Sequence, residues 1–75
     1  DNVYALNNYA YYLSLRDENL EKAERMSFRS NQLEKDNSSF LDTYAWILFR
    51  QKKYKEAKEW IERALRASNS QSATI

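Results

Sequence analysis

The feature that most constrains this sequence is an internal repeat of residues spaced as on one face of a helix. When the segment over residues 3–15 is moved forward by 35 positions (45 − 10), four of its residues fall on identical residues. The four pairs are Leu6 and Leu41, Tyr9 and Tyr44, Ala10 and Ala45, and Leu13 and Leu48. Their steps of three and four residues are typical of the buried stripe of an amphipathic helix. A helical stripe that returns at such a period predicts stacked helical hairpins.

A second stretch repeats with a spacing one residue shorter, since moving it by 34 positions (57 − 23) places Ala23 on Ala57. The difference of one predicts an extra residue in the first turn, where an insertion costs little. Either Ser39 or Ser38 is suited to cap the third helix. Residues 68–75 are polar and lack a helical period, which predicts a frayed tail or a linker stub. The expected helices cover about residues 3–15, 19–34, 39–51 and 54–67.

The composition excludes most catalytic and metal-binding chemistry. The sequence has no Cys and no His, so it lacks a thiolate nucleophile, the usual general base and the commonest metal ligand. We therefore expect no enzyme activity, no metal site and no cofactor. The net charge is +1 with acidic and basic residues intermixed, which gives little attraction to nucleic acid.

Nothing in the sequence predicts insertion into a membrane. No apolar run approaches the ~18 residues that a membrane span needs, and no signal-peptide pattern is present. The expectation is a soluble protein, with the compartment undetermined and the cytoplasm slightly favoured.

The repeat resembles the tetratricopeptide repeat, a helix–turn–helix of 34 residues. The matching residues take fixed places in that repeat: the small residue at the helix crossing (Ala10 and Ala45), the alanine early in the second helix (Ala23 and Ala57), and the large and small residues that follow it (Ile61 and Ala64). The resemblance covers about residues 3–68 as two units, of which the second is the closer match.

The sequence departs from the family pattern in the first unit and in the turns. Ser27 stands where a bulky apolar residue is expected, and Ser30 stands where Ala is usual. The usual turn Gly is replaced by Lys52 or Lys53. These changes leave the turns less sharply specified and keep the packing face intact.

The resemblance implies an all-α fold of two antiparallel helix–turn–helix hairpins, four helices in all, stacked as a right-handed α-solenoid segment. The domain would cover residues 1–68, with repeat one over about residues 3–37 and repeat two over about residues 38–68. Residues 69–75 would form the polar tail or linker stub. We expect the chain to be a fragment of a longer, bacterial-type repeat protein.

Packing within and between the hairpins is expected to use the repeated face. A small Ala at a crossing lets two helix axes approach, while the flanking Leu and Tyr side chains fill the groove between ridges. The expected packing residues are Leu6, Tyr9, Ala10, Leu13, Ala23, Leu41, Tyr44, Ala45, Leu48, Ala57, Ile61 and Ala64.

The remaining face of the first and third helices is the candidate binding surface, because the first helix of each stacked hairpin lines the concave side. Tyr11 and Trp46 correspond at the 35-residue spacing, and large rigid aromatics dominate recognition energy when half exposed. Trp46 has an alternative role in packing against a neighbouring hairpin, as has Phe49. The concave set is Tyr4, Asn7, Tyr11, Asp42, Trp46, Phe49 and Arg50, with Ser14 and Ser39 beside it.

Asn7 and Asp42 are suited to bonding the backbone amides of a bound peptide, although Asp42 has an alternative role as a charge at a helix N-terminus. The family's chaperone-adaptor branch grips a terminal carboxylate with a Lys/Asn/Arg clamp. Tyr11 and Trp46 stand where the clamp asparagines are expected, which argues against that specialisation.

Two functions follow from these expectations. The first is a protein–protein interaction module, or scaffold, that presents a concave aromatic groove to a peptide segment of a partner protein. The alternative is a structural element that stacks on further repeats, or forms a homo-oligomer, through its open hydrophobic ends. The last expected helix supports this alternative because it ends apolar, with Trp60, Ile61 and Leu65.

Overall fold

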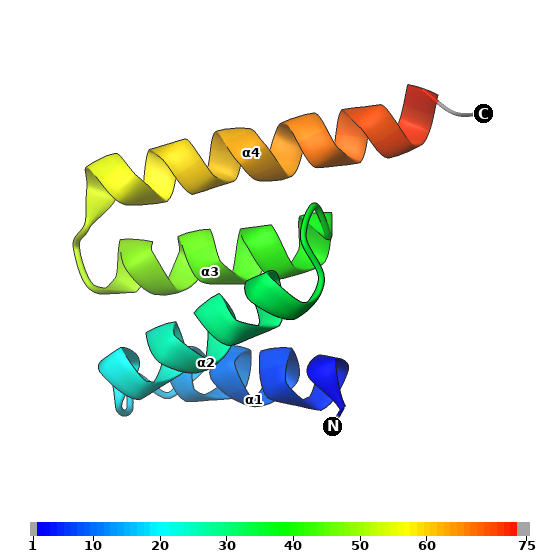
Figure 1. Ribbon diagram of the computed structural model, residues 1–75. Coiled ribbons are helices and arrows are strands. Elements are labelled where there is room, and N and C mark those ends of the chain that lie inside the picture. The colour runs from blue at the N-terminus through cyan, green and yellow to red at the C-terminus, as the bar shows by residue number, and fades with distance from the viewer. Residues whose placement is uncertain (1, 74–75) are drawn as a thin grey trace.

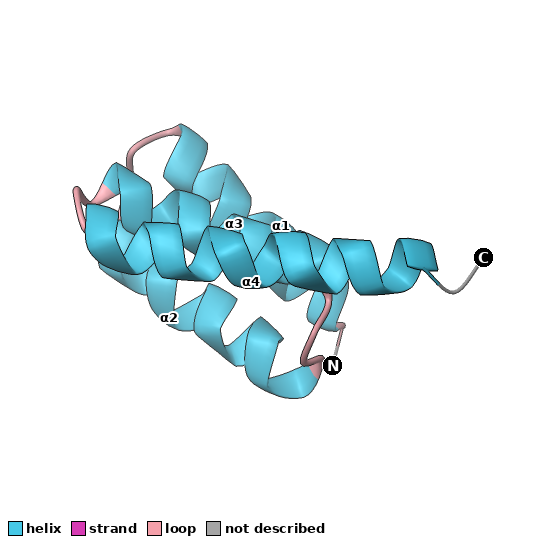
Figure 2. Cartoon of the chain, turned by 90° about the horizontal axis from the view of Figure 1, so that it is seen from above, coloured by secondary structure: helices cyan, strands magenta, loops and turns pink. Residues whose placement is uncertain are grey.

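A computed structural model describes the backbone of residues 2–73 and the side chains of residues 2–68. These residues form four α-helices and contain no strand, which confirms the predicted all-α fold. The helices form two hairpins, and the third helix lies in the middle and contacts each of the other three (Figure 1). Seen from above, the second helix runs at an angle to the fourth (Figure 2). The helices are α1 (Val3–Leu15), α2 (Leu20–Leu33), α3 (Ser38–Arg50) and α4 (Tyr54–Ala73).

The turns inside the two hairpins share one backbone motif. Asp17 after α1 and Lys52 after α3 both have positive φ, 57° and 67°. The next residue donates its N–H to a carbonyl of the last helical turn, that of Leu13 (3.0 Å) or of Leu48 (2.9 Å). Helices commonly end this way with Gly at the left-handed position. Lys52 is therefore the residue that takes the place of the missing turn Gly.

The first hairpin turn contains the extra residue that the unequal repeat spacing predicts. It covers residues 16–19, whereas the second hairpin turn covers residues 51–53. Asn19 accommodates the addition with a second left-handed conformation, φ 47°. Asn adopts this conformation more readily than most residues, so the insertion leaves both flanking helices intact.

The N-terminal caps of the first helices of both hairpins are asparagines. The Asn2 side chain accepts the N–H groups of Tyr4 (3.0 Å) and Ala5 (3.1 Å). Asn37 caps α3 by accepting the N–H of Phe40 at 3.2 Å. The prediction that Ser38 or Ser39 caps α3 is wrong, because Asn caps as well as Ser and stands one position earlier.

The fourth helix is longer than the sequence predicted. It continues to Ala73 instead of ending near residue 67. The added residues include no Gly or Pro, so no strong helix breaker follows the apolar face. Residues 69–73 of the expected polar tail thus have a helical backbone, and residues 74–75 lie outside the described residues. The division into a domain and a tail stays a prediction.

The core is built largely from the repeated face, together with two residues of α3 that the repeat did not mark. Phe40 and Ile47 are fully buried. Ile47 packs on Ala10, Leu13 and Ala23, which places α3 against both helices of the first hairpin. The predicted packing residues that are buried are Ala10, Leu13, Ala23, Leu41, Tyr44, Ala45, Leu48, Ala57 and Ala64, while Leu6 is half-buried.

Two predicted packing residues, Tyr9 and Ile61, are exposed because each lies on an outer side of the stack. Tyr44 is covered by Phe28 of α2 and by Trp60 of α4, whose ring centroids lie 5.8 and 4.5 Å from its own. The equivalent Tyr9 is 46% exposed, and the contact that its ring makes is with Lys22 Nζ of α2, 5.8 Å from the ring centre. Ile61 is 38% exposed at the opposite end of the stack.

The departures from the family pattern in α2 are explained by close packing. Ser27 and Ser30 are fully buried, so their small size lets α3 approach α2. The Asn31 amide donates to the carbonyl of Phe40 at 3.1 Å, which ties the two helices together. Leu33, at the end of α2, is exposed.

Candidate functional site

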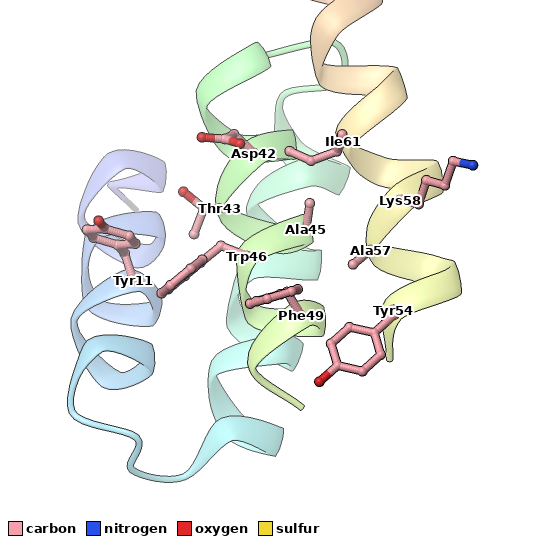
Figure 3. A pocket seen from close by; sticks show the side chains of 10 residues that line it. All are labelled: Tyr11, Asp42, Thr43, Ala45, Trp46, Phe49, Tyr54, Ala57, Lys58 and Ile61. Atoms are coloured by element: carbon pink, nitrogen blue, oxygen red, sulfur yellow. The ribbon is translucent and has the colours of Figure 1, made fainter. Parts of the chain in front are cut away.

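A groove of about 620 Å³ opens between α3 and α4, with α1 at its edge. Four members of the predicted concave set line it, and they come from both hairpins: Tyr11, Asp42, Trp46 and Phe49. The other residues that line it are Thr43, Ala45, Tyr54, Ala57, Lys58 and Ile61 (Figure 3). A shallower hollow that includes Leu65 and Ser68 shares Asp42 and Ile61 with this groove, so the depression continues along α3 and α4.

An aromatic wall forms one side of the groove. The rings of Trp46 and Phe49 stack at 6.0 Å with 23° between their planes. The ring of Phe49 also meets the ring of Tyr54 edge-on at 5.3 Å, which joins α3 to the start of α4. Phe49 is 51% exposed and Trp46 is half-buried. The Phe49 ring is therefore held between two other rings while half of the residue remains open to solvent.

Arg50 supports the aromatic wall from outside the groove. Its guanidinium lies 5.7 Å from the centre of the Trp46 ring and 3.3 Å from the Asp17 carboxylate. Asp17 belongs to the turn of the first hairpin, so this contact joins the Trp46 side of α3 to that hairpin. The buried Nε atoms of Arg50 and Trp46 have no hydrogen-bond partner among the described residues.

The structure separates the remaining members of the concave set from the groove. Tyr4 is exposed, and its ring meets the edge of Phe40 at 5.4 Å. Asn7 is buried, as is Ser14, because α3 packs against this hairpin. Asn7 is thus not accessible on the concave face, and its predicted contact with a peptide backbone is wrong for this arrangement. The equivalent Asp42 is exposed in the groove.

The α4 side of the groove includes two residues that sequence reasoning missed, Tyr54 and Lys58. The sequence placed both residues in the expected fourth helix and gave neither a binding role. Their spacing carries the signal that could have found them, since they lie four positions apart and therefore share one face of the helix.

A polar cluster at the junction of the hairpins holds the second hairpin in place. The Glu24 carboxylate accepts bonds from Gln51 Nε2 (2.7 Å) and Lys53 Nζ (3.0 Å). Burial raises the pKa of Glu24, but the hydrogen bonds from Gln51 and Lys53 outweigh it and leave the pKa below its ordinary value. Burial and the nearby Glu24 charge raise the pKa of Tyr44 to about 12.

The groove offers apolar surface and a few polar groups. Within the described part of the chain, no three His, Cys, Asp or Glu side chains gather closely enough to hold a metal ion. Over the same residues, none of the helices has the length and apolar character needed to cross a membrane. Aromatic rings and two opposite charges, those of Asp42 and Lys58, line the groove together.

Comparison with known proteins found a relative in Pseudomonas aeruginosa, described as a TPR repeat-containing protein. It is 32% identical over 65 residues, which cover 87% of this chain. The chain spans only 11% of that relative's length. No protein-family model matches the chain, and no solved structure matches it significantly.

Proposed function

Because the chain is built of two tandem repeats of the tetratricopeptide type, we propose that it is a protein-interaction module that binds a peptide segment in the groove between α3 and α4. The single observation that carries this proposal is the exposed Phe49 ring, held between Trp46 and Tyr54 in a groove. A large apolar ring that stays open to solvent in a concave site is typical of a binding surface.

The lining of the groove supports a ligand with one large apolar side chain. Ala45 and Ala57 form a small-residue floor, which leaves room for a bulky group beside Phe49. A ligand side chain there would bury apolar surface at about 25 cal/mol per Å². Asp42 and Lys58 carry opposite charges on opposite helices, and this pair would favour one direction of the bound peptide.

The proposal is tested with an array of short random-sequence peptides probed with the labelled chain. The wild type is expected to bind a subset rich in aromatic and aliphatic residues, because these fill the groove. Phe49→Ser should lose these peptides and still fold, since Ser is the residue at the equivalent position 14 of the first hairpin.

Phe28→Ser is the matched control, because Phe28 is an exposed ring of α2 that does not line this groove. It should keep the wild-type peptides. If Phe49→Ser binds the same peptides as strongly as the wild type, the groove is not the binding site.

We also propose that the chain associates with other copies through the exposed apolar surfaces of α1 and α4. The observation that favours this second function is the exposure of large apolar side chains on both helices: Tyr9, Tyr12 and Leu15 on α1, and Ile61 and Leu65 on α4. Light scattering over a wide range of chain concentration tests it. A rising mass is expected, and a strict monomer with a cooperative melt would contradict it.

A further inference from the structure

The chain itself shows how a groove between its paired helices is filled. α3 lies on the first hairpin and contacts both α1 and α2. It presents Phe40, Thr43 and Ile47, all buried, at steps of three and four residues. The face of the first hairpin beneath it contains small or polar buried residues: Asn7, Ala10, Ser14, Ala23, Ser27, Ser30 and Asn31.

The equivalent groove of the second hairpin lies between α3 and α4 and is open. Its side chains are larger and more apolar than those of the first groove. At the repeat spacings, Ser14 corresponds to Phe49, and Ser27 corresponds to Ile61. Asn31 corresponds to Leu65, which is 59% exposed. Figure 3 shows Ile61 and Ala57 on α4 directed toward the α3 side of the groove. No described segment occupies it, so it presents the kind of surface that a helix covers in the first hairpin.

α1 has a face that corresponds to the α3 face buried on the first hairpin. Moving Phe40, Thr43 and Ile47 back by 35 positions gives residues 5, 8 and 12. All three of these α1 residues are exposed, and Tyr12 is among them. α1 also exposes Tyr9 and Leu15, although a helix with apolar residues on most sides is typical of a buried position.

We infer that α1 of a second copy of the chain binds in the α3–α4 groove, in the register in which α3 binds the α1–α2 groove. This inference rests on the proposed association of copies and specifies its geometry. The α1 face of the second copy that enters the groove would be Ala5, Asn8 and Tyr12. The contact joins two different surfaces, so it propagates as an open head-to-tail row and does not close as a symmetric dimer.

The side-chain sizes in this register compensate one another. In the first groove the large Phe40 stands opposite the polar Asn31, which bonds its carbonyl at 3.1 Å. Between copies, the small Ala5 would stand opposite the large Leu65. The larger side chain thus moves from one side of the contact to the other, and the packed volume stays similar. Changes that conserve volume are those that packed cores tolerate best.

The ion pair expected between copies has its acid and its base exchanged relative to the equivalent pair within the chain. Within the chain, Glu24 of α2 binds Lys53 at 3.0 Å. The equivalent positions between copies are Lys58 of the groove and Glu18 of the incoming turn. Arg16 would take the place of Gln51 beside them, and it is already bound to Glu18 at 2.9 Å. Because Arg16 also binds Glu18, the attraction between Lys58 and Glu18 would be weaker than that between Glu24 and Lys53, but it would still be an attraction.

A charge exchange tests the register by light scattering. Lys58→Glu and Glu18→Lys should each weaken association roughly threefold to tenfold, because each places like charges across the contact. An equal mixture of the two variants should restore it, since every alternating contact then joins a Lys to a Glu. The double variant should associate as the wild type does. Lys55→Glu is the control with the same charge change outside the groove, and it should have no effect.

The outcomes separate the register from association itself. A wild-type chain that stays monomeric at every concentration overturns both. Association that ignores both charge changes, or that is lost in the single variants and not restored in the mixture, overturns this register and leaves self-association standing. Circular-dichroism melts of each variant show whether a loss of mass comes from unfolding.

Discussion

Glu24 binds Lys53 at 3.0 Å, so an acid of the first hairpin holds the turn of the second. Gln51 donates to the same carboxylate at 2.7 Å, and the hydroxyl of Tyr44 lies 3.5 Å from it. Contacts between stacked repeats usually rest on apolar packing, and the serines of α2 limit that packing here. The carboxylate therefore contributes to the position of α3 and, through it, to the shape of the groove.

We expect acid to weaken the fold through Glu24. Its folded-state pKa lies below the ordinary value of 4.5, so its stabilisation is present above that value and is lost as the pH falls through the folded-state pKa. Glu24→Gln should lower the free energy of unfolding by about 1 kcal/mol at neutral pH and reduce the loss in acid. Urea unfolding at neutral and acidic pH measures both. Glu21→Gln, an exposed acid on the same helix, should behave as the wild type, and equal losses in the two variants would contradict this role.

Alkaline pH should destabilise the chain through Tyr44. Folding raises the pKa of its hydroxyl from 10.0 to about 12, so between these values the unfolded state releases a proton that the folded state keeps. Stability therefore falls as the pH rises through this window, by about 2 kcal/mol over its width. Tyr44→Phe cannot ionise, and its unfolding free energy should fall less. Chemical unfolding at several pH values checks this, and parallel curves for the two proteins would refute it.

The repeat spacing predicts the helices well because the same local pattern produces the same local structure. The bounds of α1 are as predicted, and α3 ends one residue from the expected position. Ala10 and Ala45 are both buried as predicted, since each lies where paired helices cross. A small residue on an amphipathic stripe has the same role in both hairpins, so the sequence is sufficient to assign it.

The same spacing fails where the two hairpins have different neighbours. Asn7 and Asp42 correspond in register, yet Asn7 is buried and Asp42 is exposed. Tyr9 and Tyr44 differ in the opposite sense. A stack has direction, so α3 covers one side of the first hairpin while the first hairpin covers the other side of α3. The repeat spacing carries no information about which neighbour is present, and this is why three of the seven residues of the predicted concave set lie outside the groove.

Replacing Lys52 with Gly should stabilise the chain by about 1 kcal/mol. Lys52 has φ 67°, a left-handed conformation that costs a residue with a Cβ about that much and costs Gly nothing. Lys53→Gly should have the opposite effect, because it removes the contact with Glu24 and gains no relief from strain. Thermal melts of the two variants compare neighbouring positions in the same turn. A lower midpoint for Lys52→Gly would mean that its side chain contributes more than its backbone conformation costs.

Exchanging the equivalent residues Ser27 and Ile61 tests whether the α1–α2 groove is filled while the α3–α4 groove is open. Ser27 is fully buried under α3, so Ser27→Ile should overpack the contact between the hairpins and cost about 1–3 kcal/mol. The reverse change, Ile61→Ser, removes a side chain that is 38% exposed and should cost less than about 1 kcal/mol. Its expected effect is on binding instead, because it takes apolar surface from the open groove. Denaturant unfolding gives the first comparison and the peptide array gives the second. Equal stability losses at the two positions would show that α3 does not fill the α1–α2 groove as described, and the register inferred for a second copy would then lose its template.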